Sequence, residues 1–125
     1  MLKKTKRAVL EYSNLWLNSW NRRCESYRVK HEADIYINDP ARFLELPKYE
    51  QAELLKWITE TLFPRKTINH QSTSYGLKHF YENTTRNYVT NGQFKGGMIA
   101  AGFAPVDATA LNARYRYKKL RLSVM

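Results

Sequence analysis

The side chains best suited to a specific chemistry stand together in residues 91–95. Asn91, Gln93 and Lys95 follow one another closely, with Gly92 between the first two. Asn and Gln amides can make paired hydrogen bonds to adenine, and a lysine ammonium reaches guanine or phosphate. On the exposed first turn of a helix, these groups would contact base edges in a DNA groove.

The glycines that follow leave one part of the same helix without side-chain bulk. Gly96 and Gly97 would allow another backbone to approach closely, and we include Gly96 in the expected nucleic-acid contact. The competing interpretation is that these glycines accommodate a neighbouring helix of the same protein. Asn91 and Gln93 would then only cap the helix.

A second group of cations alternates with apolar residues near the C-terminus, interleaved with Tyr115, Tyr117, Leu120 and Leu122. In an extended strand, one face would carry the cations and the other the apolar side chains. Such a row supplies phosphate contacts, which fix position but do not read sequence; the alternative is a solvated strand face. The cations that we expect to contact nucleic acid, besides Lys95, are Arg114, Arg116, Lys118, Lys119, Arg121, Lys66, Lys78 and Arg86.

The formal charge of +10 is distributed unevenly along the chain. Residues 1–30 hold eight Lys/Arg and two acids, residues 31–64 hold three and seven, and residues 65–125 hold ten and two. We expect the two basic ends to gather into one positive surface beside the glycine-bearing helix, which would attract a polyanion. The alternative is that the charges only solvate helix faces.

Residue patterns typical of catalysis or of cofactor binding are missing. His31, His70 and His79 share no metal-ligand spacing with Cys24. Gly96-Gly97 lacks the Lys-Ser/Thr ending of a phosphate-binding loop. We therefore expect a binding protein rather than an enzyme, with no metal and no cofactor.

The apolar spacing predicts mainly helices with little strand. The predicted helices are Lys4–Cys24, a short one from Pro40 to Leu46, Pro47–Leu62, one from Ser72, Thr73 or Ser74 to Asn83, and Asn91–Ala101. The predicted strands are Ala33–Ile37 and part of Ala113–Val124, where Arg114–Tyr117 is the best candidate. The latter could form a short hairpin or wing with Lys118 and Lys119 near its turn.

The helix over residues 91–101 has the clearest boundaries. Thr90 and Gln93 have the spacing of a capping box, and Val89 and Phe94 that of a hydrophobic staple. Gly102 is suited to end the helix in the left-handed conformation.

These elements predict a mainly α fold of the α+β type. We expect one compact domain over residues 1–125, with a helical half (1–64) and a helix-turn-helix-like half (65–125) that ends in a basic strand. The connector Asn83–Val89 is longer than the tight turn of many helix-turn-helix units. The longest apolar runs span only a few residues and no signal peptide is apparent, so we expect a soluble protein of the cytoplasm without membrane contact.

The stretches Thr73–His79, Tyr88–Lys95 and Ala101–Phe103 resemble a pattern in small uncharacterised proteins of Gram-positive phages and conjugative elements. The resemblance implies a mobile-element origin. With it come two expected roles, regulation of the element's DNA or inhibition of a host defence.

Three functional hypotheses follow. The first is a DNA-binding regulator, with duplex DNA as the favoured partner and RNA as the second choice. The alternative is an inhibitor of the anti-CRISPR type that binds an RNA-guided nuclease ribonucleoprotein. A third is a structural virion or assembly protein that forms a homodimer by pairing its first helix through Trp16 and Trp20.

Overall fold

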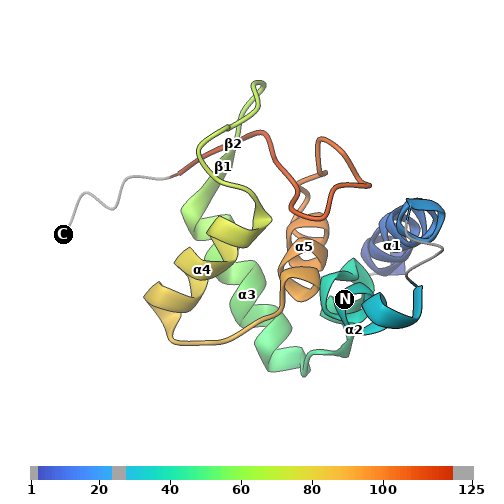
Figure 1. Cartoon of the computed structure of the whole chain (residues 1–125). Coiled ribbons are helices and arrows are strands. Elements are labelled where there is room, and N and C mark those ends of the chain that lie inside the picture. The colour runs from blue at the N-terminus through green and yellow to red at the C-terminus, as the bar shows by residue number, and fades with distance from the viewer. Residues whose placement is uncertain (1–2, 24–27, 120–125) are drawn as a thin grey trace.

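The computed structural model describes residues 3–23 and 28–119 of the chain (Figure 1). The fold is mainly helical, as the sequence predicts, with one antiparallel pair of short strands. In chain order the elements are α1 (Lys3–Arg23), α2 (Arg28–Asn38), the 3₁₀ helix η2 (Pro40–Glu45), α3 (Lys48–Thr61), β1 (Leu62–Pro64), α4 (Ser74–Thr85), α5 (Asn91–Ala100) and β2 (Tyr117–Lys119).

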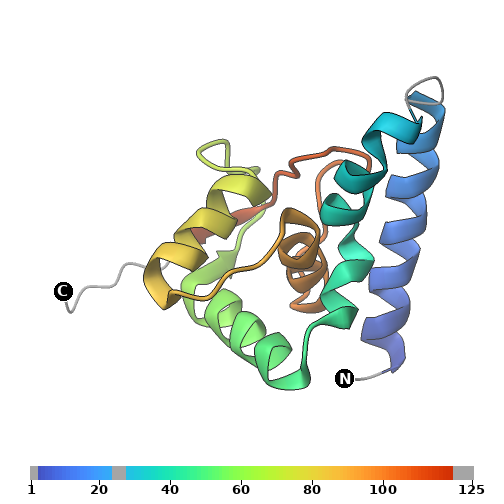
Figure 2. The same ribbon diagram turned by 60° about the horizontal axis from the view of Figure 1, so that its bottom comes forward.

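Helix α5 lies at the centre of the molecule. Figures 1 and 2 show α3 and α4 on one side of it and α1 and α2 on the other, and all four helices contact it. Eight of its ten residues are buried. A helix surrounded in this way needs apolar or small residues on every side, and the sequence of α5 supplies Phe94, Met98 and Ile99 together with three glycines.

Two of these glycines let η2 approach the backbone of α5. A Cβ atom on Gly92 would lie 2.6 Å from the backbone nitrogen of Asp39, and one on Gly96 would lie 2.5 Å from the Cβ of Phe43. Gly97 faces α3, where a Cβ would lie 2.6 Å from Cδ2 of Leu54. The interpretation that Gly96 and Gly97 accommodate neighbouring helices of the same protein is therefore confirmed.

Both ends of α5 are closed as the sequence predicts. The Thr90 hydroxyl accepts a hydrogen bond from the Gln93 amide at 3.1 Å, while the Gln93 side chain accepts one from the Thr90 amide at 2.9 Å. At the other end, Gly102 has φ of 98°. The amides of Phe103 and Gly102 donate to the carbonyls of Met98 and Ile99, which is the Schellman arrangement.

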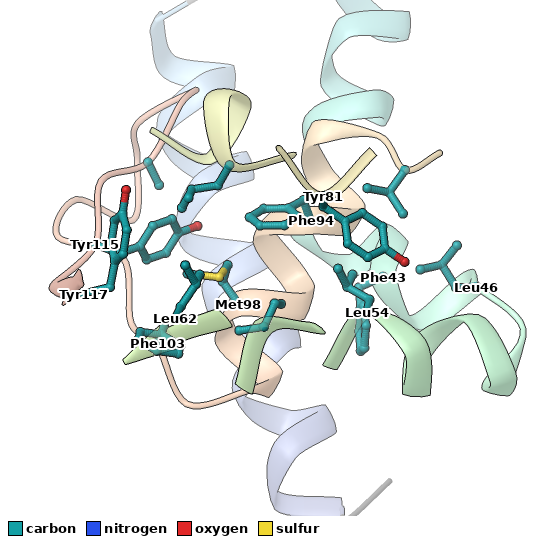
Figure 3. Packing of buried hydrophobic residues seen from close by; sticks show 14 residues of the cluster. Phe43, Leu46, Leu54, Leu62, Tyr81, Phe94, Met98, Phe103, Tyr115 and Tyr117 are labelled. Carbon is teal, nitrogen blue, oxygen red and sulfur yellow. The ribbon is translucent and has the colours of Figure 1, made fainter. Parts of the chain in front are cut away.

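The main hydrophobic core lies where α3, α4, α5 and the C-terminal segment meet (Figure 3). Leu54, Leu77, Phe94, Met98 and Tyr117 are all fully or almost fully buried in it. The ordered core is thus built by residues from both halves of the chain, so the two halves pack as one body around α5.

Helix α1, which the sequence predicts over nearly the same residues, covers the remaining side of α5. Val9, Ser13 and Trp16 are buried, and the rings of Trp16 and Trp20 stack with centroids 5.6 Å apart. Because Trp16 is wholly buried within one molecule, it is unavailable for the predicted pairing with a second copy.

Within the described residues, the C-terminal strand pairs with a distant strand, so the predicted turn of the wing near Lys118 and Lys119 is wrong. Strand β2 pairs antiparallel with β1, with Lys118 opposite Phe63 and Lys119 opposite Leu62. Both lysines therefore lie inside a strand and not at a turn. Leu62 and Tyr117 are buried in the same core cluster, and this shared burial holds β2 beside β1.

Residues 33–37 are helical, so the predicted strand there is wrong. They belong to α2, in which the side-chain amide of Asn38 donates to the Asp34 carbonyl at 2.7 Å. Ile35 and Asn38 are half-buried, and Asp34, Tyr36 and Ile37 are exposed. This spacing of three residues is that of a helix, and a short apolar run cannot by itself distinguish it from alternation.

Substitution of Gly96 tests the close contact between α5 and η2. We expect Gly96→Ala to lower the free energy of unfolding by about 2 kcal/mol or more, because the added methyl group would meet η2 in a tightly packed site. Gly76 is the matched control, since it also lies in a helix but a Cβ there meets only the Ser72 side chain, at 3.4 Å. Chemical denaturation of both variants measures the difference, and equal effects would contradict the role of the contact.

Candidate nucleic-acid interface

The predicted base-reading residues of α5 lie inside the protein. Asn91 is 7% exposed and Lys95 is 3% exposed, and Gly92 and Gly96 are buried. Gln93 is half-buried and uses its side chain in the capping box. Because these residues pack within the protein, α5 cannot insert them into a DNA groove, and the prediction that they read one is wrong. The competing interpretation, in which Gln93 serves as a cap, is confirmed.

Asn91 connects three parts of the structure instead. Its Nδ2 atom lies within hydrogen-bonding distance of Asn38 Oδ1 (2.8 Å), the Leu111 carbonyl (3.0 Å) and Asn112 Oδ1 (3.1 Å). Its Oδ1 accepts a hydrogen bond from the buried Ser74 hydroxyl at 2.9 Å. The amide therefore links α2, α4 and the loop that follows α5.

Lys95 is held in the interface between α5 and α1. Its Nζ donates to the Leu111 carbonyl at 3.1 Å and lies 4.5 Å from the centroid of the Trp16 ring. Burial lowers the pKa of Lys95 to about 7, and the negative charge of Asp39 opposes this decrease. Lys95 therefore carries no accessible positive charge for a polyanion.

A helix-turn-helix unit is not confirmed. Helix α4 and helix α5 are joined by a connector over residues 86–90, but a recognition helix must present one face to the major groove. The central position of α5 leaves it no such face, because α1, α3, α4 and η2 all pack against it.

Two other predicted cations lie apart from any basic surface. Lys78 is buried, and its ammonium donates to both carboxylate oxygens of Glu82 at 3.1 and 3.2 Å. Arg86 is exposed at the far end of α4. A helix of 12 residues is about 18 Å long, which separates Arg86 from the residues that precede Ser74.

The remaining predicted cations gather near the β1–β2 pair. We define the basic face as Arg65, Lys66, Arg114, Arg116, Lys118 and Lys119. All except the half-buried Arg114 are exposed. Arg121 lies outside the described residues. The loop over residues 65–71 protrudes beside the strands in Figure 1, so the face combines two segments far apart in the sequence.

The predicted alternation of the C-terminal segment is confirmed over residues 113–118. Ala113, Tyr115 and Tyr117 are buried, while Arg116 and Lys118 are exposed. The tyrosines therefore fix the segment in the core and turn the intervening cations outward. They are core residues and not platforms for base stacking.

A hollow of about 470 Å³ lies within the basic face. Its lining residues are Arg65, Ile68, Asn69, His70, Gln71, Lys118 and Lys119. The buried Asn69 fixes the loop to the C-terminal segment, since its backbone amide donates to Tyr115 and its side chain donates to the Tyr117 carbonyl at 3.1 Å. The hollow is thus held in shape by the backbone of the protein.

The charges of the basic face remain uncompensated. The Arg65 guanidinium donates to the Thr67 and Ile68 carbonyls, each at 3.0 Å, and Arg114 donates to the His70 carbonyl at 2.8 Å. These partners are neutral, so they orient the guanidinium groups without cancelling their charge. In the ion pairs found among residues 3–23 and 28–119, none of the six cations takes part.

Arg65 and Arg114 both contact the loop over residues 65–71, because Arg65 donates to the Thr67 and Ile68 carbonyls and Arg114 to the His70 carbonyl. Burial raises the pKa of the Tyr117 phenol, and the two positive charges act in the opposite direction by favouring the phenolate.

The two basic ends of the chain do not merge into one surface. Helix α1, which carries six of the eight cations of residues 1–30, lies on the opposite side of α5 from β2 in both Figures 1 and 2. The predicted continuous surface is therefore wrong, and only the C-terminal cations contribute to the basic face.

No protein-family model, no curated protein and no solved structure matches the chain. None of the helices in the described part of the chain combines the length and apolarity needed to cross a bilayer. Within the same residues, no three His, Cys, Asp or Glu side chains come together in a way that could hold a metal ion. The resemblance to mobile-element proteins over Thr73–Phe103 stays a prediction.

Sequence reasoning missed Arg65 and His70 as parts of this interface. Both stand in a polar connector without helical or strand periodicity. Their position depends on the pairing of β1 with β2, for which a local pattern holds no signal. The available signal was the absence of acids from residues 65–71 and 113–119 alike.

The buried state of Lys95 predicts a pH dependence of stability. Between pH about 7 and 10.5 the unfolded lysine stays protonated while the folded one has lost its proton. Folding then releases a proton, so wild type should gain stability relative to Lys95→Met as the pH rises. The slope is at most about 1.4 kcal/mol per pH unit. Urea denaturation at several pH values measures it, and parallel curves for the two proteins would contradict the burial of Lys95.

Proposed function

We propose that this protein binds nucleic acid through the sugar-phosphate backbone, using the basic face near the β1–β2 pair. The observation that carries the proposal is the convergence of six cations from two segments that contain no acid. Phosphate contacts of this kind supply most of the affinity of non-specific binding.

The shape of the basic face supports an extended polyanion. Lys118 and Lys119 line the hollow from one strand, and Arg65 and His70 line it from the protruding loop. A phosphodiester chain that lies in the hollow can therefore contact cations of the loop on one side and of the strand on the other. Arg65 keeps guanidinium hydrogens beyond its two backbone contacts, because a guanidinium has five of them.

The rigidity of the face supports the same proposal. Residues 113–116 are connected to residues 65–74 by backbone hydrogen bonds, among them Ser74 N to Ala113 O at 2.7 Å and Arg65 N to Arg116 O at 3.2 Å. Cations on a pre-ordered backbone lose less conformational entropy on binding than cations on a disordered tail.

The proposed contact positions the protein on nucleic acid without reading bases through α5. It therefore differs from recognition by a helix in the major groove. As part of the proposal, the resemblance adds a mobile-element setting, in which the element's own DNA is the polyanion that a regulator would bind.

Paired charge removals test the proposal. Arg116→Ala with Lys118→Ala removes two exposed cations of the basic face. We expect weaker binding to duplex DNA and a lower dependence of log K on log salt, by about 0.9 for each phosphate that the variant no longer neutralises. Fluorescence anisotropy with a labelled duplex at several salt concentrations measures both quantities.

The matched control is Lys48→Ala with Lys56→Ala, which removes the same charge from exposed positions on α3. This pair should leave affinity and salt slope close to those of wild type. Equal losses in the two double variants would mean that only net charge matters, and the basic face would not be the binding site.

A further inference from the structure

A second hollow, of about 390 Å³, lies beside the first turns of α4. It is lined by Ile37, Asn38, Tyr75, Lys78, Tyr88, Thr90, Asn91, Leu111 and Asn112. We infer that this hollow takes an unpaired base of a single-stranded nucleic acid whose phosphates lie on the basic face. The inference rests on the proposed function and names the form of nucleic acid that the protein prefers.

Two exposed tyrosines form the aromatic part of the hollow. Tyr88 is 74% exposed and Tyr75 is 51% exposed, although large aromatic side chains are usually buried. Both rings lie beside the ammonium of Lys78, with centroids 5.2 and 5.6 Å from its Nζ. The shared contact holds the two rings at one hollow, where a base can stack on an aromatic face.

The charge of the hollow favours a base over a phosphate. Lys78 is the only cation among its lining residues, and Glu82 neutralises it through both carboxylate oxygens. The basic face has no such compensating carboxylate among the described ion pairs. Phosphates are therefore attracted to the basic face, while a neutral aromatic ring suits the second hollow.

Three of the lining residues, Asn38, Asn91 and Asn112, carry side-chain amides, which can complement the edge of a base. Asn91 Nδ2 has two hydrogens and three acceptors in reach, so Asn38, Leu111 and Asn112 share them. In the described structure, Asn112 is exposed and its Nδ2 makes no hydrogen bond. A free amide donor beside an amide acceptor matches the paired groups on adenine.

Two segments of the chain, residues 70–75 and residues 112–118, connect the hollow of the basic face (the cationic hollow) with the second hollow (the aromatic hollow). Residues 70 and 71 line the cationic hollow and Tyr75 lines the aromatic one. In the second segment, Asn112 lines the aromatic hollow and Lys118 the cationic one. Six residues span at most about 20 Å, a distance that a few nucleotides of a single strand can cover. A duplex keeps its bases paired and stacked, so it can use only the basic face.

Tyr88→Ala tests the inference, with Tyr88→Phe as the conservative variant and Tyr49→Ala as the matched control. Tyr49 is similarly exposed but lies on α3, outside the hollow. We expect Tyr88→Ala to weaken binding of a short single-stranded oligonucleotide roughly tenfold, while Tyr88→Phe and Tyr49→Ala bind as wild type does. Duplex binding should be the same in all four proteins.

A fluorescent base gives an independent readout. An oligonucleotide with one 2-aminopurine should lose fluorescence on binding wild type, because stacking on tyrosine quenches the base, and should lose less with Tyr88→Ala. Parallel titrations of DNA and RNA oligonucleotides determine which of the two is preferred.

The outcomes separate this inference from the proposed function. If wild type binds single strands and Tyr88→Ala binds them equally well, the aromatic hollow is not a base site, although the basic face still binds. If wild type binds neither single strands nor duplexes at low salt, the proposed function fails and the inference fails with it.

Discussion

The contact of α5 with the backbone of residues 39–40 determines most of the structure. Gly92 and Gly96 stand one helical turn apart; a larger side chain at Gly92 would collide with the backbone of Asp39, and one at Gly96 with Pro40 and Phe43 of η2. This contact places α5 at the centre, where α1, α3 and α4 can pack around it. Asn91 and Lys95 lie on the same helix and therefore have internal roles, as a link between segments and as a buried amine.

The burial of α5 divides the cations of the C-terminal half into two groups. Lys78 and Lys95 are inside, where a carboxylate, a carbonyl or an aromatic ring contacts each ammonium. Arg116, Lys118 and their neighbours are outside, where the buried Tyr115 and Tyr117 turn them toward solvent. Among the described residues of this half, the second group and the isolated Arg86 keep a charge that a partner can reach. The protein can therefore be strongly basic and still have a single compact basic face in its C-terminal half.

Local signals predicted much of the fold. The capping box at Thr90, the left-handed residue Gly102 and the apolar stripes of α1 and α3 depend on residues within a few positions of one another, and each is present. The residues of α2 were misassigned, because five residues of mixed polarity fit either a strand or a helix. The position of α2 against α5 settles the choice, and that contact lies more than fifty residues away along the chain.

The candidate site was predicted only in part. The C-terminal cations and Lys66 belong to the basic face, but the residues of α5 do not. Gly96 and Gly97, which suggested close approach to nucleic acid, permit close approach to η2 and α3, and the sequence alone does not distinguish these partners. The pairing of β1 with β2, which brings Arg65 beside Lys118, is equally invisible without the fold.

The most direct measurement is a map of backbone amide chemical shifts during titration of ¹⁵N-labelled protein with a short duplex at low salt. If the surface near β1 and β2 binds nucleic acid and the central helix does not, we expect shifts in residues 65–71 and 114–119, with the amides of residues 91–95 unchanged. Shifts confined to residues 91–95, with residues 65–71 and 114–119 unaffected, would contradict this expectation.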